Sequence, residues 1–113
     1  MSTIFRKIIA KEIPADILFE NDNILVFRDI NPQAPVHFLV IPKKEISTIN
    51  DLNVSDVPLI GEMLLVAKNI AKSEGIDESG YRIIFNCNEN GQQTVFHVHL
   101  HVLGGRKLTW PPG

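Results

Sequence analysis

The sequence predicts a single α+β domain in which a five-stranded antiparallel sheet packs against one long helix. Two observations lead to this prediction. Five short segments rich in Val, Ile, Leu and Phe are separated by turn-forming residues, which is typical of strands. One longer segment, residues 54–74, instead repeats its apolar side chains at helical spacing. No linker, internal repeat or low-complexity segment interrupts the chain, so residues 1–113 are expected to form one domain.

The first half of the chain predicts a short helix followed by three strands. Thr3 is a suitable N-cap for a helix over residues 4–10, whose isoleucines and phenylalanine form an apolar stripe. Strands are then expected at residues 17–20, 24–29 and 37–41. The polar turn between the first two of these strands makes them a hairpin.

The second half predicts the main helix and the last two strands. The helix is expected over residues 54–74, with Ser55 as its N-cap and Gly75 as the residue that ends it. Strands are expected at residues 81–86 and 94–103, with a polar loop between them.

Charge and composition narrow the class of protein. The formal net charge of −2 gives no general attraction to nucleic acid or to anionic membranes, so neither is expected as a partner. Cys87 is the single cysteine, which excludes an intramolecular disulfide and a Cys-x-x-Cys zinc site. We find no signal peptide pattern and no apolar stretch of membrane-spanning length. A soluble, cytoplasmic protein is therefore expected.

Three histidines alternate with apolar residues in the last predicted strand. They are His97, His99 and His101, and the only other histidine is His37. Side chains at alternate positions of a strand point to one face, so three imidazoles are expected in a row, roughly 6–7 Å apart. The row therefore marks the candidate functional site.

Three interpretations of this row stay open from the residues themselves. A buried structural row would need partners for six ring nitrogens. A zinc site would need a further ligand, because three histidines on one straight strand span too far and no Asp or Glu neighbours them in the sequence. Imidazoles near neutral pH also bind phosphate, transfer protons and act as nucleophiles. This third interpretation fits the residue inventory best, so no metal or other cofactor is expected.

The segment His-Val-His-Leu-His-Val-Leu at residues 97–103 resembles the signature of the histidine triad (HIT) family. Residues 4–14 and 27–44 resemble its Hint branch, the histidine triad nucleotide-binding proteins, as do the Leu-Gly-Gly-Arg segment and the Trp-Pro-Pro-Gly ending. The resemblance covers essentially the whole chain in order. It implies hydrolysis of purine nucleoside phosphoramidates to a nucleoside monophosphate and an amine, without a metal.

The resemblance also implies a catalytic role for each matched residue. His99 would attack the α-phosphorus and form a nucleotidyl-histidine intermediate, while a backbone carbonyl holds its second ring nitrogen. His37 and His101 would support this arrangement and contact phosphate, and His97 would be structural. Thr94 would donate a hydrogen bond toward the leaving amine.

Binding roles follow from the same resemblance. Asp29 would accept from the ribose hydroxyls beside Ile30, and Asn86 and Gln93 would fix the phosphate. The base pocket would be lined by Ile4, Phe5, Ile8, Ile13 and Phe27. The residues themselves leave alternatives open, since Asp29 can be a turn cap, Asn86 can serve its loop, and the phenylalanines can be ordinary core.

The resemblance further implies a homodimer with a continuous ten-stranded sheet. The main helix and the strand at residues 81–86 would form the interface, and the tail around Trp110 would approach the partner's active site. The amphipathic ring of Trp110 suits an interface. Gly61 inside the helix is explained equally well by a close helix neighbour and by a tolerated defect.

Two positions depart from the pattern of the family. Thr94 stands where Ser is common, and Gln92 stands where Gly is common. The third histidine, His101, favours hydrolysis over nucleotidyl transfer, and the Trp-Pro-Pro-Gly ending argues against the dinucleoside polyphosphate hydrolase branch. That hydrolase, and a nucleotide-binding adaptor with incidental catalysis, remain the alternative functions.

Overall fold

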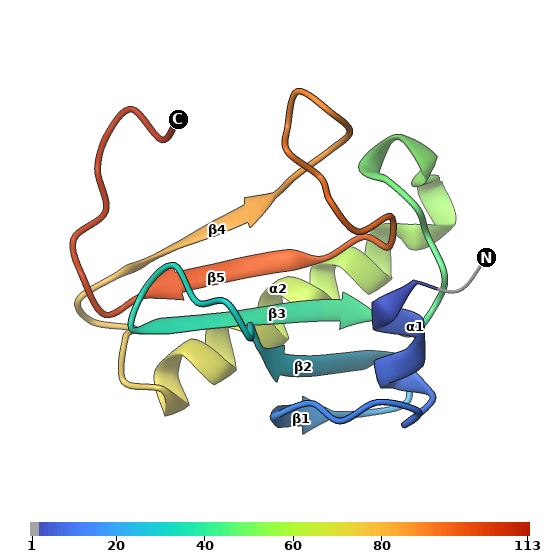
Figure 1. The fold of residues 1–113 in the computed structure, drawn as a ribbon, viewed down its shortest axis with the longest axis horizontal. Helices are drawn as coiled ribbons and strands as arrows, with labels where there is room; N and C mark the ends of the chain where they lie inside the picture. The colour runs from blue at the N-terminus through green and yellow to red at the C-terminus, as the bar shows by residue number, and fades with distance from the viewer. Residues whose placement is uncertain (1–2) are drawn as a thin grey trace.

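A computed structural model describes residues 3–113 (Figure 1). The sheet is built from β1 (Ile17–Glu20), β2 (Ile24–Arg28), β3 (Val36–Pro42), β4 (Tyr81–Phe85) and β5 (Leu100–Gly104). The helices are α1 (Ile4–Ile9) and α2 (Val57–Ser73), with two short 3₁₀ turns, η1 (Ile49–Asp51) and η2 (Val54–Asp56), between β3 and α2. No helix within residues 3–113 is long and apolar enough to cross a membrane.

All five strands pair antiparallel in the order β1-β2-β3-β5-β4, which confirms the predicted fold class. The strands β1 and β4 therefore form the two edges of the sheet. The predicted hairpin is β1 and β2, whose turn is closed by Asn21, because its side-chain oxygen accepts from the backbone N–H groups of Asn23 and Ile24.

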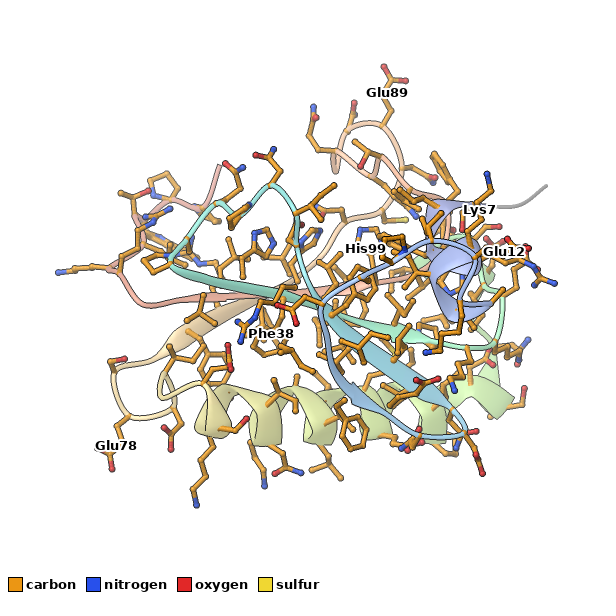
Figure 2. The ribbon with its side chains drawn as sticks, turned by 60° about the horizontal axis from the view of Figure 1, so that its bottom comes forward. Lys7, Glu12, Phe38, Glu78, Glu89 and His99 are labelled. Atoms are coloured by element: carbon orange, nitrogen blue, oxygen red, sulfur yellow. The ribbon has the colours of Figure 1, made fainter. Side chains whose placement is uncertain are left out.

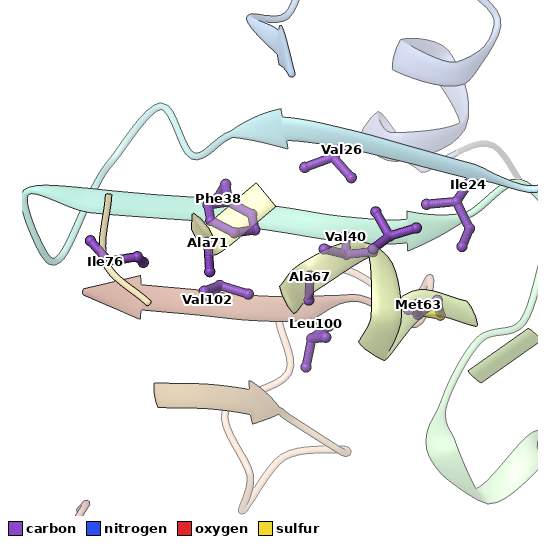
Figure 3. Packing of buried hydrophobic residues seen from close by; sticks show 11 residues of the cluster. Ile24, Val26, Phe38, Val40, Met63, Ala67, Ala71, Ile76, Leu100 and Val102 are labelled. Atoms are coloured by element: carbon purple, nitrogen blue, oxygen red, sulfur yellow. The ribbon is translucent and has the colours of Figure 1, made fainter. Parts of the chain in front are cut away.

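The long helix α2 covers one face of the sheet, and the main hydrophobic core lies between them (Figure 3). Alternate residues of β2, β3 and β5 point to this face, as the period of a strand requires. The fully buried members include Phe38, Val40, Leu100 and Val102 from the strands and Met63 from α2. Phe38 lies between the sheet and α2 in Figure 2 as well.

The short helix α1 lies on the opposite face and closes a second, smaller core. Phe5 and Ile8 of α1 pack there on strand residues that point away from α2, namely Leu25, Phe27 and Leu39. Thr3 caps α1 as predicted, since its hydroxyl accepts from the backbone N–H of Arg6 at 3.1 Å. This face carries the odd-numbered residues of β3 and β5, and therefore His37 and His101.

The predicted last strand, residues 94–103, is wrong at its start, because β5 begins only at Leu100. Continuation of the ladder toward residue 98 would require a backbone donor at Pro42 of β3, and proline has none. The N–H of Val98 instead donates to the carbonyl of Ile46 at 2.7 Å. His97 and His99 consequently lie in an irregular segment before the strand, and only His101 is part of the sheet.

The predicted start of the main helix is also wrong. Residues 54–56 form the separate 3₁₀ turn η2, and α2 begins at Val57, with Pro58 in its first turn. Asn53 is the N-cap of η2, since its side chain accepts from the backbone N–H of Ser55 and Asp56 completes a capping box. The predicted end is confirmed, because Gly75 follows the C-cap of α2 with φ of +76°.

Candidate active site

A cavity of about 360 Å³ lies between α1 and the sheet, on the face opposite α2. Its apolar wall contains the whole predicted base pocket, namely Ile4, Phe5, Ile8, Ile13 and Phe27. Its polar wall is formed by Asp29, Thr94, His99 and His101, and Ile30 stands beside them, almost fully exposed. The fold thus brings together most of the predicted site residues around one opening.

The orientation of His99 is fixed by the segment that precedes it. Its Nδ1 atom lies 2.7 Å from the carbonyl oxygen of His97, and a carbonyl only accepts hydrogen bonds. Nδ1 therefore carries the proton, and the lone pair is on Nε2. The ring of Phe5 meets the His99 ring edge to face, with centroids 4.9 Å apart.

His37 and His101 form a second fixed pair beside His99. The backbone N–H of Gln33 donates to Nδ1 of His37 at 3.0 Å, so the proton of neutral His37 is on Nε2. That Nε2–H donates to Nδ1 of His101 at 2.9 Å, which places the proton of His101 on Nε2. The centroids of the His99 and His101 rings lie 4.9 Å apart, and both residues line the cavity.

Asp29 has one of the two roles that the sequence left open, that of turn cap, and it also contacts a histidine. One carboxylate oxygen accepts from the backbone N–H of Asn31 at 2.8 Å and so closes the turn after β2. The other oxygen lies 3.4 Å from Nε2 of His37, and Asp29 also lines the cavity. No local pattern in the sequence places a carboxylate near the histidines, because the pairing of β2 with β3 brings Asp29 beside His37.

His97 does not share the row predicted for the three histidines. It is almost completely buried, and its Nε2–H donates to the carbonyl of Pro42 at 2.7 Å. Its Nδ1 has no hydrogen-bond partner within the part of the chain that the structure describes. The ring also packs edge to face against Phe5, with centroids 6.2 Å apart, so His97 joins the histidine segment to β3 and α1.

Burial lowers the pKa of all four histidines from the ordinary value. The effect is largest at His101, whose pKa falls to about 4 because burial and the neighbouring His99 and His37 all disfavour its charged form. The carboxylate of Asp29 opposes these shifts at His37, His99 and His101. Near neutral pH the four imidazoles are therefore uncharged, and the hydrogen bonds above select their tautomers.

Three predicted binding residues lie outside the cavity wall. The side-chain amide of Asn86 donates to the carbonyl of Gly91 at 2.7 Å, within its own loop. Gln93 is buried, and its amide donates to the carbonyls of Ser47 and Val95. Trp110 is 82% exposed, and the guanidinium of Arg82 lies 5.9 Å from the centre of its ring.

One group of side chains has the composition of a metal site. Asp29, His37 and His101 each offer a ligand atom, and these atoms lie within 4.8 Å of one another. A single ion bound by both histidines would replace the hydrogen bond between their rings. Asp29 thus supplies the carboxylate that the zinc interpretation needed and that no sequence neighbour of the histidines provides. The ring nitrogens of His37 and His101 that face each other are, however, already hydrogen-bonded to one another.

Four residues of the cavity wall were not predicted from the sequence. Pro14, Ala15, Leu39 and Val95 complete the apolar surface around the base pocket. Pro14 directly follows the predicted pocket residue Ile13, and Leu39 is two residues from His37 in β3 and so on the same face of the sheet, which gave both a local signal. Nothing in the sequence around Val95 distinguished it from an ordinary strand residue.

The chain is similar to known proteins over most of its length. Residues 2–109 match a family model described as scavenger mRNA decapping enzyme C-term binding. The purine nucleoside phosphoramidase of Escherichia coli strain K12 is 52% identical over 106 residues, which cover 94% of this chain and 89% of that protein. An uncharacterized HIT-like protein of Synechococcus elongatus is 54% identical over 111 residues, covering 98% and 96%.

A solved structure shares the fold closely. The crystal structure of a HIT family hydrolase from Legionella pneumophila Philadelphia 1 superposes with a TM-score of 0.97 at 56% sequence identity. The match covers 99% of this chain and 100% of that chain.

Proposed function

The chain belongs to the histidine triad (HIT) family, and we propose that it hydrolyses purine nucleoside phosphoramidates to a nucleoside monophosphate and an amine. The observation that carries the proposal is the state of His99. Its Nδ1–H donates to the His97 carbonyl, so its nucleophilic Nε2 is unprotonated at the wall of a cavity large enough for a ligand.

The cavity supports a nucleotide in one orientation. A flat purine fits against the apolar wall beneath α1, where Phe5 and Phe27 lie with ring centroids 5.5 Å apart. Asp29 stands at the other part of the wall and accepts hydrogen bonds from the ribose hydroxyls. The phosphate then lies at His99 and His101, the two imidazoles of the cavity wall.

The reaction has two steps. Nε2 of His99 forms a bond to the α-phosphorus while the bond from phosphorus to the amine nitrogen breaks, and the amine takes a proton from solvent water as it leaves. Water then attacks the phosphorus of the nucleotidyl-histidine, the bond to His99 breaks, and the attacking water releases its proton to solvent. The nucleoside monophosphate and the free amine are the products, and neither step requires a metal ion.

Neighbouring residues take supporting roles in this proposal. The Nε2–H of His101 donates to a phosphate oxygen, and His37 fixes that tautomer through its hydrogen bond to His101. Thr94 donates its hydroxyl toward the leaving amine. Asn86 and Gln93 position the phosphate indirectly, because their side-chain amides hydrogen-bond to backbone carbonyls of the surrounding loops. His97 provides the backbone carbonyl that orients the ring of His99.

A homodimer is part of the same proposal. Tyr81 and Ile83 of the edge strand β4 are exposed on the face that α2 covers elsewhere, and Leu64 and Leu65 of α2 are exposed as well. Among residues 3–113, apart from the helix itself, no atom lies within 4 Å of the position that a Cβ at Gly61 would take, so another helix can approach closely there. In such a dimer the tail around Trp110 reaches the partner's active site.

The test is turnover of an adenosine phosphoramidate that carries a fluorescent amine, measured in chelator with the wild type and His99→Ala. We expect chelator-resistant turnover by the wild type and a loss of about a thousandfold or more in the variant. Absence of turnover by a wild type that still binds adenosine monophosphate would favour an adaptor. Turnover of diadenosine polyphosphates alone would favour a hydrolase of those compounds.

A further inference from the structure

A second hollow adjoins the nucleotide cavity at the start of α1. This groove, of about 610 Å³, is lined by Thr3 and Ile4, by Glu45 and Ser47, and by residues 94–96. Its walls come from three segments that are distant in the sequence: the start of α1, the chain after β3, and the irregular segment before the histidines.

The groove and the cavity are adjacent. Ile4, Thr94 and Val95 line both of them, so these three residues mark the boundary that a ligand reaching from one into the other would follow. Of the polar residues that line the cavity, only Thr94 also lines the groove. A group attached to a phosphate at His99 therefore has the groove ahead of it when it points toward Thr94.

The groove carries a negative charge and an aromatic ring. Among residues 3–113, Glu45 is the one charged residue that lines it. Arg6 donates to only one of the carboxylate oxygens, Oε2, at 2.8 Å, and within residues 3–113 no hydrogen bond reaches the other oxygen. The ring of Phe96 is 47% exposed, and aromatic faces attract ammonium groups.

We propose that this groove receives the substituent of the leaving amine. Glu45 is then a specificity-determining residue, which favours amines whose substituent ends in a cationic group. The inference rests on the proposed phosphoramidate hydrolysis and adds the class of leaving group to it. The expected preference for cationic amines is modest, because the Glu45 side chain is half exposed and already forms an ion pair with Arg6.

The experiment compares two substrates of equal length in the intact protein. One is the adenosine phosphoramidate of 1,5-diaminopentane, and the other is that of n-hexylamine, which replaces the terminal ammonium by a methyl group. The readout is the ratio of their kcat/KM values, in which any general loss of activity cancels. The unsubstituted adenosine phosphoramidate is measured alongside, as a test of the proposed function alone.

Two variants of opposite expected effect test the role of Glu45. In the wild type we expect the cationic substrate to be favoured by about threefold, a typical size for an exposed ion pair. Glu45→Gln should bring the ratio close to one, whereas Arg6→Gln should raise it, because the carboxylate loses its present partner. Glu78→Gln, in the loop after α2 and away from His99 in Figure 2, should leave the ratio unchanged.

The failures can be told apart. Turnover of the unsubstituted compound with a ratio near one in the wild type, or with the same ratio in Glu45→Gln, would overturn this inference and leave the proposed function intact. No turnover of any of the three compounds by the wild type would overturn both.

Discussion

Nδ1 of His99 lies 2.7 Å from the carbonyl oxygen of His97, two residues earlier in the same chain. The contact exists because the segment before β5 is not a regular strand, in which side chains stand away from their own backbone. A single backbone carbonyl thereby sets the tautomer of the proposed nucleophile. The position of this carbonyl depends in turn on the side chain of His97, whose Nε2–H donates a hydrogen bond to the carbonyl of Pro42 in β3.

The first prediction concerns this anchoring by His97. His97→Ala should lower the free energy of unfolding by roughly 2–4 kcal/mol, because it removes a buried hydrogen bond and leaves a cavity. His97→Gln should recover part of the loss, because the glutamine amide reaches a similar position to Nε2 and can donate to Pro42. Urea unfolding of the two variants measures the difference, and equal destabilisation would contradict the role of this hydrogen bond.

The second prediction concerns pH. The pKa of His101 is lowered to about 4 by burial and by its histidine neighbours, against an ordinary value of about 6.5. Between these values the unfolded chain binds more protons than the folded protein, so the free energy of unfolding rises with pH. The contribution of His101 is complete above pH 6.5 and is lost as the pH falls toward 4, with a slope of about 1.4 kcal/mol per pH unit.

Urea unfolding at several pH values between 4.5 and 6.5 checks this sign. The free energy of unfolding of His101→Gln should rise less steeply with pH than that of the wild type, and the difference in slope should correspond to about one bound proton. Carboxylates that titrate in the same range affect both proteins equally and cancel in the comparison. Identical slopes for the two proteins would show that His101 titrates normally in the folded state.

The third prediction separates the two roles of Asp29. Asp29→Asn keeps a side-chain oxygen for the N–H of Asn31, and so preserves the turn, but it removes the charge that accepts from ribose. Binding of adenosine monophosphate should weaken by about tenfold to a hundredfold, the usual size of a lost hydrogen bond to a charged group. Calorimetric titration measures this loss of affinity. The control is the 2′,3′-dideoxy nucleotide, which lacks both ribose hydroxyls. A variant that binds both nucleotides like the wild type would reduce Asp29 to a turn cap.

The fourth prediction concerns the proposed dimer. Ile83→Arg places a charge on the exposed apolar face of β4 and should shift the protein from dimer to monomer in light scattering after gel filtration. Ile17→Arg is the matched control, because Ile17 lies in β1 at the other edge of the sheet and is similarly exposed, at 38% against 45%. A monomeric wild type, or loss of the dimer in both variants, would contradict an interface at β4.

Much of the fold follows from local patterns in the sequence. The N-cap at Thr3, the hairpin turn at Asn21 and the helix end at Gly75 depend on side chains within a few residues, and all three are where the sequence places them. The residues of the predicted base pocket follow from the resemblance, and the structure brings them together at one cavity. The alternation of β2 explains the position of Phe27, which points toward α1 while Val26 points toward α2.

The remaining features depend on contacts between distant segments. The late start of β5 is imposed by Pro42, a residue of the neighbouring strand. The approach of Asp29 to His37 depends on how the turn after β2 folds back, and the buried position of His97 depends on a carbonyl 55 residues away in sequence. No periodicity within the histidine segment contains this information.

The central claim is that Nε2 of His99 becomes covalently bound to the nucleotide. The direct measurement is intact-protein mass spectrometry after rapid alkaline quenching of a single turnover of an adenosine phosphoramidate, followed by peptide mapping. We predict a transient adduct of one adenosine monophosphate on the peptide that contains His99, and no adduct in His99→Ala. Full turnover without any adduct, or an adduct on His37 or His101, would contradict the assignment of His99 as the nucleophile.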